Sequence, residues 1–301
     1  MKTKQEKQIF HSLTAKLLFL AKRGRPDILT PVSVMTARTN DPDEDDWAHL
    51  RRIVSYLMRT KHEGIKLKPG NTLKIEAYVD AAYAAHPDGK GVTGVVIKVG
   101  GATVYCQSSK QKLVVRSSTE AELVAIDDAM GQILWTRNVL EAQGYSQDQQ
   151  PAILYQDNQS TMWMANNGRS NKKRTKHINQ RYYFITDQVT RGTVKIVYKS
   201  TKDMIADLLT KPIQGSRFEK LKEAIGIYPG KGKAKTNARS STSSHPDEVN
   251  DNEEHSSKPS PLQGCVEERQ TQDPGMCREK EMTVGPRPLE RNKFYMLEVD
   301  E

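Results

Sequence analysis

Cysteines and long apolar runs are both scarce in this chain, and each shortage excludes a class of protein. Cys106, Cys265 and Cys277 are too few and too scattered for a disulfide framework or a zinc cluster, which indicates a reducing compartment. No apolar run reaches the ~18 residues of a membrane-spanning helix, so no membrane span is expected. Residues 1–8 are rich in lysine and lack the apolar core of a signal peptide, so we do not expect a secreted protein.

Positive charge is concentrated in the first three quarters of the chain. The 301 residues carry a formal charge of +9. Residues 231–301 hold 11 Lys and Arg against 14 Asp and Glu, which leaves 35 against 23 for residues 1–230, a net charge of +12. A basic globular part with an acidic-leaning tail favours a polyanionic partner.

Composition divides the chain into three regions, 1–70, 71–226 and 227–301. The first region is predicted to be helical, because apolar residues recur in it with helical spacing. The last region is rich in Ser, Pro, Gly and charge and has few large apolar side chains. It cannot bury enough surface to offset the entropy of ordering, so we predict a disordered tail.

The middle region, residues 71–226, carries the signals of a mixed α/β fold. Gly100-Gly101 joins two strand-like runs and is typical of a two-residue hairpin. Ser117 and Glu120 have capping-box spacing at the start of a long amphipathic helix. Strands are predicted at 73–83, 91–99, 102–107, 152–156 and 193–198, and helices at 117–143, 158–166, 176–189 and 202–210. The order βββαβααβα predicts a mixed sheet flanked by helices.

Four carboxylates stand where catalytic acids at a sheet edge are expected. Asp80 ends one strand-like run and Asp157 follows another. Glu122 lies in the first turn of the long helix, and Asp207 lies in the last predicted helix. A single aspartate after a strand is more often a turn or cap residue, but this set from distant segments would form a site that repels itself. Divalent cations neutralise such a site in two-metal hydrolysis of a phosphodiester.

Five ordered motifs give the middle region a family resemblance. They are Tyr78-Val79-Asp80-Ala81-Ala82, Ser117-Ser118-Thr119-Glu120-Ala121-Glu122, Tyr155-Gln156-Asp157-Asn158-Gln159-Ser160, Arg174-Thr175-Lys176-His177-Ile178 and Ile205-Ala206-Asp207-Leu208-Leu209-Thr210-Lys211-Pro212. In these motifs the chain resembles the ribonuclease H domain of copia-type long-terminal-repeat retrotransposon polyproteins. Residues 8–66 are similar to the segment that follows the reverse transcriptase palm in those polyproteins. No Tyr/Phe-x-Asp-Asp polymerase motif precedes them, so we expect that this chain cannot polymerise DNA. It looks like a C-terminal part of a larger polyprotein.

The resemblance implies a ribonuclease H-like fold and hydrolysis of the RNA strand of an RNA–DNA hybrid. The family's four metal-binding acids map onto Asp80, Glu122, Asp157 and Asp207. Two Mg²⁺ ions roughly 4 Å apart would activate water and stabilise the leaving 3′-oxygen. Mn²⁺ is expected to substitute for Mg²⁺, because both ions prefer carboxylate oxygens. The products would carry 5′-phosphate and 3′-hydroxyl ends.

The second acid has two candidates, Glu120 and Glu122. Helical geometry separates them by about 200° around the helix axis, so they cannot both face one site. The segment Glu122-Leu123-Val124-Ala125-Ile126 resembles the helix of the family. This favours Glu122 as the metal ligand and Glu120 as the capping partner.

Polar and basic residues near the acids are candidates for nucleic-acid binding. Asn158 and Gln159 are expected to contact 2′-hydroxyls, which distinguish RNA from DNA. For a basic cluster further along, phosphate contact is favoured over a nuclear-localisation patch or a solvated loop. Its members are Lys172, Lys173, Arg174 and Lys176. Trp135 and Trp163 are expected in the core.

Two positions depart from the pattern of the family. A second Asp often follows the first by two residues, but Ala82 stands there, and we place it outside the metal site. Cellular ribonucleases H commonly carry a histidine before the last acid, but residues 198–203 have none. Product release or metal exchange is therefore expected to be slower, or to involve Lys199 or Lys202.

Three function classes compete. The first is an active ribonuclease H whose partners are RNA–DNA hybrids and the remainder of a retroelement polyprotein, in cytoplasmic particles, in the nucleus, or in both. The second is a catalytically silent remnant that binds nucleic acid or a protein partner. The third is a strand transferase such as an integrase, which is disfavoured because integrases place their Glu after the last strand. Glu122 instead lies between the first two Asp residues.

Overall fold

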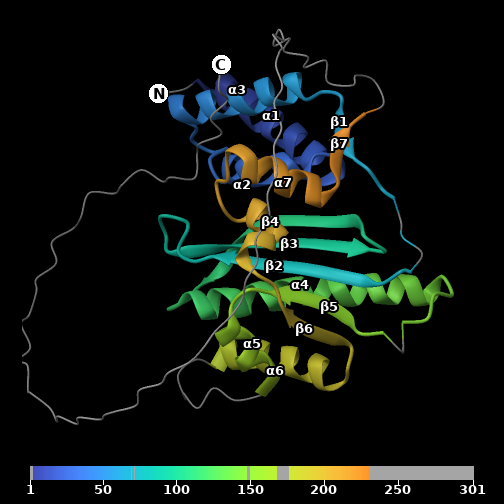
Figure 1. Ribbon diagram of the computed structural model, residues 1–301. Coiled ribbons are helices and arrows are strands. Elements are labelled where there is room, and N and C mark those ends of the chain that lie inside the picture. Colours follow the sequence, from blue (N-terminus) through green and yellow to red (C-terminus); the bar gives the residue numbers. More distant parts are fainter. Residues whose placement is uncertain (1–2, 69, 71, 148–149, 168–175, 231–301) are drawn as a thin grey trace, which may run out of the picture. The chain divides into compact units, whose positions relative to one another are not determined.

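A five-stranded mixed sheet lies at the centre of the computed structural model, which describes residues 3–68, 70, 72–147, 150–167 and 176–230 (Figure 1). Its strands are β2 (Ile75–Ala82), β3 (Lys90–Val99), β4 (Ala102–Val114), β5 (Ala152–Gln156) and β6 (Val194–Tyr198), in the order β4-β3-β2-β5-β6. Strands β2, β3 and β4 pair antiparallel, whereas β5 runs parallel to both β2 and β6. The predicted mixed α/β fold is confirmed.

The β3–β4 hairpin turns at the two glycines that predicted it. Gly100 and Gly101 have φ angles of 59° and 81°, in the left-handed region that glycine adopts without strain. Strand β4 continues to Val114, seven residues beyond the predicted end at 107. The extension begins with polar residues, from Ser108 to Lys112, which an edge strand tolerates because one side of its hydrogen-bond ladder is unpaired.

Three helices cover one face of the sheet. The long helix α4 (Ser118–Ala142) packs on β2 and β3, and α5 (Gln159–Asn167) and α6 (Lys176–Thr190) pack on α4 (Figure 1). The Ser117 hydroxyl accepts a hydrogen bond from the Glu120 amide at 3.2 Å and so caps α4. The shared core includes Val79, Ile97, Leu123, Ile126, Met130, Ile133 and Leu154, all of which are fully buried.

A second group of helices packs against Val96 on the other face of the sheet and forms a second hydrophobic core. The group consists of α1 (Lys4–Arg23), η1 (Pro26–Ile28), α2 (Leu29–Thr36), α3 (Glu44–Arg59), η3 (Ile205–Leu209) and α7 (Gly215–Ile225). Phe10, Ile28 and Ile53 from the first region share this core with Leu209 and Ile225. The division of the chain at residue 70 stays a prediction, but its first region shares a core with residues of the second.

A short antiparallel pair also joins the segment after α3 to the C-terminal end of the described chain. Strand β1 (Glu63–Ile65) pairs with β7 (Ile227–Pro229), which the composition had placed in the disordered tail. Backbone pairing with β1, rather than any apolar pattern of its own, makes this segment a strand. The rest of the predicted tail, residues 231–301, lies outside the described residues. Among the described residues, no helix has the length and apolarity needed to cross a membrane.

The segment that carries Asp207 is not the single helix predicted over 202–210. It forms two short 3-10 helices, η2 (Thr201–Asp203) and η3, separated by Met204 in an extended conformation. Helix η3 lies close against β3, because a Cβ at Gly94 would come within 2.5 Å of the Thr210 Cγ2 and 3.0 Å of the Ala206 carbonyl oxygen. Only glycine permits this approach, which holds the Asp207 segment beside the end of β2.

Candidate metal centre

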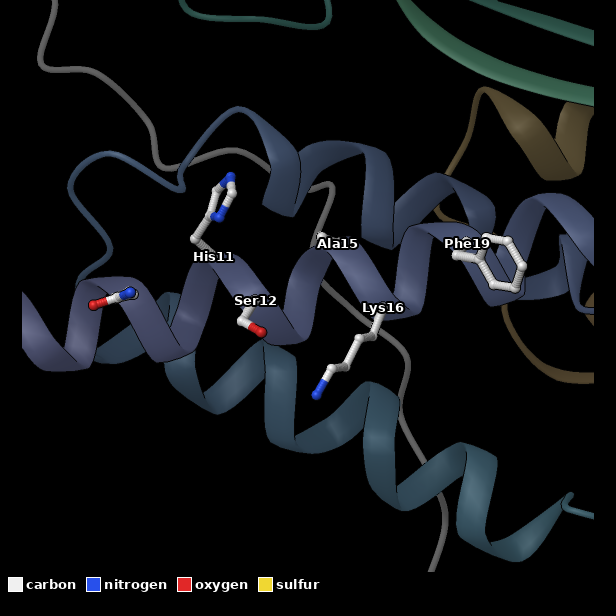
Figure 2. Close-up of a pocket in the computed structure, with 6 residues that line it drawn as sticks. His11, Ser12, Ala15, Lys16 and Phe19 are labelled. Carbon is white, nitrogen blue, oxygen red and sulfur yellow. The ribbon is translucent and has the colours of Figure 1, made fainter.

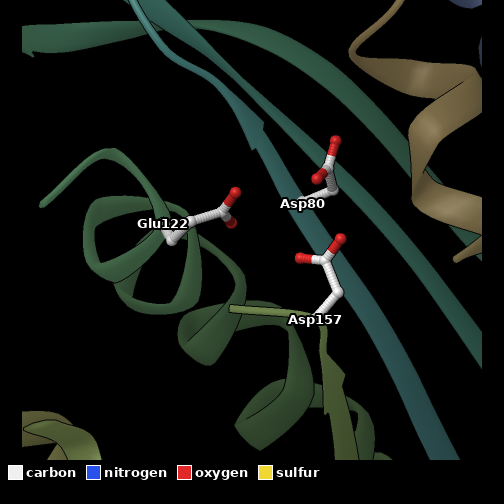
Figure 3. Close-up of side chains that lie close together, drawn as sticks. All are labelled: Asp80, Glu122 and Asp157. Carbon is white, nitrogen blue, oxygen red and sulfur yellow. The ribbon is translucent and has the colours of Figure 1, made fainter. Parts of the chain in front are cut away.

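Three of the four predicted acids lie together at the sheet edge (Figure 3). Tyr78 of β2 pairs with Tyr155 of the parallel strand β5, so Asp80 and Asp157, two residues further on, come level with each other. Glu122 joins them from the start of α4, which packs on β2. One carboxylate oxygen from each of the three acids lies within 4.8 Å of the other two. The fold therefore makes one cluster of acids from two strands and a helix.

The two candidate glutamates occupy different environments. Glu122 is 6% exposed and belongs to the acid cluster. Glu120 instead accepts a hydrogen bond from the Arg116 amide at 2.8 Å, ahead of the helix. The placement agrees with the division of roles drawn from the helical geometry, and the catalytic role of Glu122 stays a prediction.

Burial and nearby negative charge oppose the ionisation of Asp80 and Glu122. Burial raises the pKa of Asp80 to about 7, with Asp207 and Asp157 adding to the rise and Lys211 opposing it. Burial, followed by the charges of Asp80 and Asp157, raises the pKa of Glu122 well above its ordinary value. Clustered carboxylate oxygens are the ligands that hard divalent cations prefer. The three side chains thus fit a divalent metal ion.

Gln156 connects two of the acids, and sequence reasoning missed it. Its side chain is completely buried, and its Nε2 donates to the Glu122 Oε2 at 3.2 Å. Its Oε1 accepts from the amides of Asp157 and Asn158 at 2.7 and 3.0 Å. Gln156 therefore fixes both the Glu122 carboxylate and the turn that carries Asp157. Its place directly before Asp157 in one of the family motifs was the available signal.

Asp207 stands apart from the cluster. It is completely buried, and its two oxygens accept from Lys211 and Arg217. Lys211 also donates to Asp80, whose second oxygen accepts from the Thr210 hydroxyl. Within the described chain, the group of acids that could hold a metal comprises Asp80, Glu122 and Asp157. A ligand role for Asp207 stays a prediction.

The predicted nucleic-acid residues lie partly inside the described structure. The Asn158 Oδ1 accepts from the Thr161 amide at 3.0 Å and so caps α5, while Gln159 is exposed at the helix start. Three members of the basic cluster, Lys172, Lys173 and Arg174, lie outside the described residues, as does the side chain of the fourth, Lys176. Contact of any of them with nucleic acid stays a prediction.

The two tryptophans expected in the core are exposed. Trp135 is 59% exposed and Trp163 is 60% exposed. Trp135 follows the buried Ile133 by two residues, which places it about 200° around the axis of α4. Trp163 has the same relation to Thr161 and Ala165, the buried residues of α5. Tryptophan was expected to be buried because it is large and apolar, but the position of each tryptophan around its helix axis places it on the exposed side.

A shallow groove on the outer face of α1 is unrelated to the acids (Figure 2). Its walls are formed by Gln8, His11, Ser12, Ala15, Lys16 and Phe19. These side chains come from a single helix and include no carboxylate. The groove does not fit a metal, and we assign it no function.

The buried acids should make the stability of the metal-free protein depend on pH. Asp80 has a pKa of about 7 in the folded protein and about 4 in the unfolded chain. Between these two pH values, the folded protein keeps the proton that the unfolded chain has lost. The folded state then binds more protons across this window, so stability falls as pH rises through it. Between pH 5 and 8 we expect Asp80 to lower the free energy of unfolding by about 3 kcal/mol.

Urea unfolding in EDTA at both pH values measures this loss, with Asp80→Asn as the control that should reduce the pH dependence. Mg²⁺ should oppose the loss at pH 8, because it binds the ionised folded state. If the metal-free wild type loses no more stability between pH 5 and pH 8 than Asp80→Asn does, the raised pKa of Asp80 is contradicted.

Comparison with known proteins identifies relatives among retrotransposon polyproteins. The chain is 35% identical over 219 residues to the retrovirus-related Pol polyprotein from transposon RE2 of Arabidopsis thaliana, covering 72% of this chain and 15% of that protein. It is 30% identical over 220 residues to the one from transposon TNT 1-94 of Nicotiana tabacum, covering 73% and 16%. Secreted RxLR effector protein 161 of Plasmopara viticola is 31% identical over 125 residues, 41% of this chain and 88% of that protein. No family model matches the chain.

Similar solved structures include a ribonuclease H1 and a foamy viral protease-reverse transcriptase. A ribonuclease H1 isolated from compost by a metagenomic approach has a TM-score of 0.36 and 19% identity, over 46% of this chain and 93% of that one. The foamy viral protease-reverse transcriptase in complex with an RNA/DNA hybrid has a TM-score of 0.42 and 12% identity, over 66% and 27%.

The sheet order, with an acid on β2, one on α4 and one after β5, defines a ribonuclease H-like fold. The chain belongs to the retrovirus-related Pol polyproteins of copia-type transposons, as its motifs predicted. It spans about 15% of the length of these relatives.

Proposed function

We propose that this chain is a metal-dependent ribonuclease H that hydrolyses the RNA strand of RNA–DNA hybrids. The observation that carries the proposal is the convergence of Asp80, Glu122 and Asp157 to within 4.8 Å at the edge of the sheet. The net charge of +12 on residues 1–230 supports a polyanionic substrate. We do not expect DNA polymerase activity.

The three clustered acids would hold the metal, and their neighbours keep them in place. When bound, Mg²⁺ would supply an activated water and charge stabilisation for the leaving 3′-oxygen, with two ions in the full mechanism and Mn²⁺ as a substitute. Gln156 orients the Glu122 carboxylate through its side-chain amide. The Thr210 hydroxyl donates a hydrogen bond to one oxygen of Asp80 and so fixes the orientation of that carboxylate. Attack by water, rather than by the ribose, gives 5′-phosphate and 3′-hydroxyl ends.

Two groups of residues are proposed to recognise the hybrid. Asn158 and Gln159 directly follow Asp157, where they would contact the 2′-hydroxyls of the RNA strand. Lys172, Lys173, Arg174 and Lys176 would contact phosphates of the same duplex. The remainder of the Pol polyprotein is the proposed protein partner, in cytoplasmic particles, in the nucleus, or in both.

Cleavage of a labelled RNA–DNA hybrid in Mg²⁺ tests the proposal. We expect the wild type to cut the RNA strand, and Asp157→Asn, which keeps the shape and removes one ligand charge, to cut at least about a hundredfold more slowly. Single-stranded RNA and duplex DNA are the substrate controls and should remain intact. A wild type that binds the hybrid but cuts it in neither Mg²⁺ nor Mn²⁺ would exclude the enzyme.

A catalytically silent remnant that binds nucleic acid or a protein partner is the second candidate. The Plasmopara viticola protein favours it, since 88% of that protein corresponds to part of this chain without the rest of a Pol polyprotein. Hybrid binding without cleavage in Mg²⁺ and in Mn²⁺ would select this candidate.

A further inference from the structure

Two cationic side chains project into the acidic site, and the proposed mechanism gives them no part. Lys211 and Arg217 both contact the carboxylate of Asp207, whose side chain is completely buried. Their own side chains are 38% and 49% exposed, so each reaches inward from the surface. A role for them rests on the proposed function, because it concerns how the metal centre takes up its ions.

Lys211 lies between two carboxylates. Its Nζ donates to the Asp207 Oδ1 at 2.5 Å and to the Asp80 Oδ1 at 3.3 Å. The remaining oxygens of the pair are also engaged, because the Asp207 Oδ2 accepts from Arg217 and the Asp80 Oδ2 accepts from the Thr210 hydroxyl. Arg217 does not share this position, since within the described part of the chain its ion pair is with Asp207.

The backbone holds Lys211 in this position. Its amide donates to the Asp207 carbonyl oxygen at 2.9 Å, and the preceding Thr210 amide donates to the same oxygen at 3.2 Å. The turn formed by Asp207, Thr210 and Lys211 packs against Gly94, where no larger residue would fit. The fold therefore holds the backbone of Lys211 where its ammonium group can reach both carboxylates.

Formal charges favour one divalent ion in this arrangement. With all groups ionised, Asp80, Glu122, Asp157 and Asp207 contribute four negative charges, and Lys211 and Arg217 contribute two positive ones. A single divalent cation at the three clustered acids neutralises the remainder. A second cation between Asp80 and Asp207 would meet the Lys211 ammonium at close range, where like charges repel strongly.

We propose that Lys211 is a built-in cation that occupies the place between Asp80 and Asp207. The protein without nucleic acid then takes up one divalent ion, at Asp80, Glu122 and Asp157. A bound hybrid brings phosphate groups that give Lys211 another partner, and its withdrawal admits a second ion. Lys211 thereby couples complete metal loading to the presence of substrate.

Counting Mn²⁺ ions by calorimetry and by paramagnetic resonance tests this, without any measurement of cleavage. At pH 8 without nucleic acid, we expect one site in the wild type and two in Lys211→Met, the second at least about tenfold tighter than any second site of the wild type. Arg217→Met is the matched control, because it removes one positive charge from the same carboxylate but leaves Lys211 in place. It should retain one site, as should Lys211→Arg.

Two measurements keep the test decisive if Lys211→Met does not fold. Lys211→Gln removes the charge and keeps a hydrogen-bond donor, and should also bind two ions. Adding a 2′-O-methyl RNA–DNA hybrid, which resists hydrolysis, should raise the count in the wild type from one to two.

Each contrary result has a distinct meaning. Two tight ions in the free wild type, or one ion in both neutral Lys211 variants, would overturn the role of Lys211. A second ion in Arg217→Met would show that net charge, and not the place of Lys211, sets the count, and would also overturn it. A wild type that binds no ion would instead remove the proposed metal centre, and with it the proposed function.

Discussion

Glu122→Gln is expected to abolish cleavage of the hybrid and to stabilise the metal-free protein at pH 8. Burial and the neighbouring charges of Asp80 and Asp157 raise the pKa of Glu122, so the ionised carboxylate destabilises the folded state. Glutamine has the same shape, carries no charge and keeps an oxygen for the hydrogen bond from Gln156. It is a poor metal ligand, and we expect cleavage to fall at least about a thousandfold.

Cleavage rates in Mg²⁺ and urea unfolding in EDTA measure the two effects. The matched control is Glu120→Gln, two residues earlier on the same helix. Glu120 accepts a hydrogen bond from the Arg116 amide and lies outside the acid cluster. Its replacement should leave cleavage unchanged within about twofold and slightly lower stability through a weaker helix start.

The opposite assignment of the two glutamates would reverse this pattern. Loss of cleavage in Glu120→Gln with activity retained in Glu122→Gln would refute the site. Loss of activity in Glu122→Gln together with a large loss of stability would show that the variant fails by unfolding. Lost activity combined with gained stability would show that the Glu122 carboxylate destabilises the fold and is required for cleavage.

Removal of residues 1–62 is expected to prevent the remaining chain from folding cooperatively. Helices α1, α2 and α3 cover one side of a core to which Val96, Leu208, Leu209 and Phe218 contribute. Eight residues of that core lie beyond residue 62, and exposing them costs on the order of 10 kcal/mol, as much as the whole stability of a typical domain. Strand β7 keeps β1 as its partner, but β1 loses the helix that leads into it.

Urea unfolding followed by circular dichroism, together with binding of a hydrophobic dye, measures the result. The matched truncation ends the chain at residue 230. Both described cores lie within residues 10–225, so this second truncation should keep the unfolding midpoint of the full chain. If residues 63–230 unfold cooperatively with undiminished stability, the helical region is a separate domain, as the composition of the chain suggested.

A buried ion pair supports the expectation that the first helices are an ordered part of the fold. Arg25 and Asp27 pair at 2.7 Å, with side chains 5% and 0% exposed. The Tyr56 hydroxyl donates to Asp27 at 2.7 Å, and Arg25 donates to the hydroxyl and carbonyl oxygens of Thr60. Both charged groups are hydrogen-bonded, as a buried pair requires, and the network ties η1 to the end of α3.

The sequence by itself determined the five strands of the central sheet, the long helix and the order of the acids. Alternating and helical spacing of apolar residues are local signals, and so are the Gly100-Gly101 turn and the Ser117 cap. The acids at 80, 122 and 157 follow these elements at short range. Once a mixed sheet is assumed, the parallel pairing of two strands brings their following residues to one edge.

Only the tertiary structure decided what surrounds those acids and what covers the second face of the sheet. In the sequence, Gln156 is a single polar residue within a strand. In the structure, its side-chain amide joins Glu122 to the turn that carries Asp157. Lys211 lies 131 residues from Asp80 along the chain, and no local pattern relates the two. The packing of α1 and α2 on the sheet likewise joins distant segments. Contacts of this kind depend on how complete elements pack, and the spacing of residues within any one element does not record them.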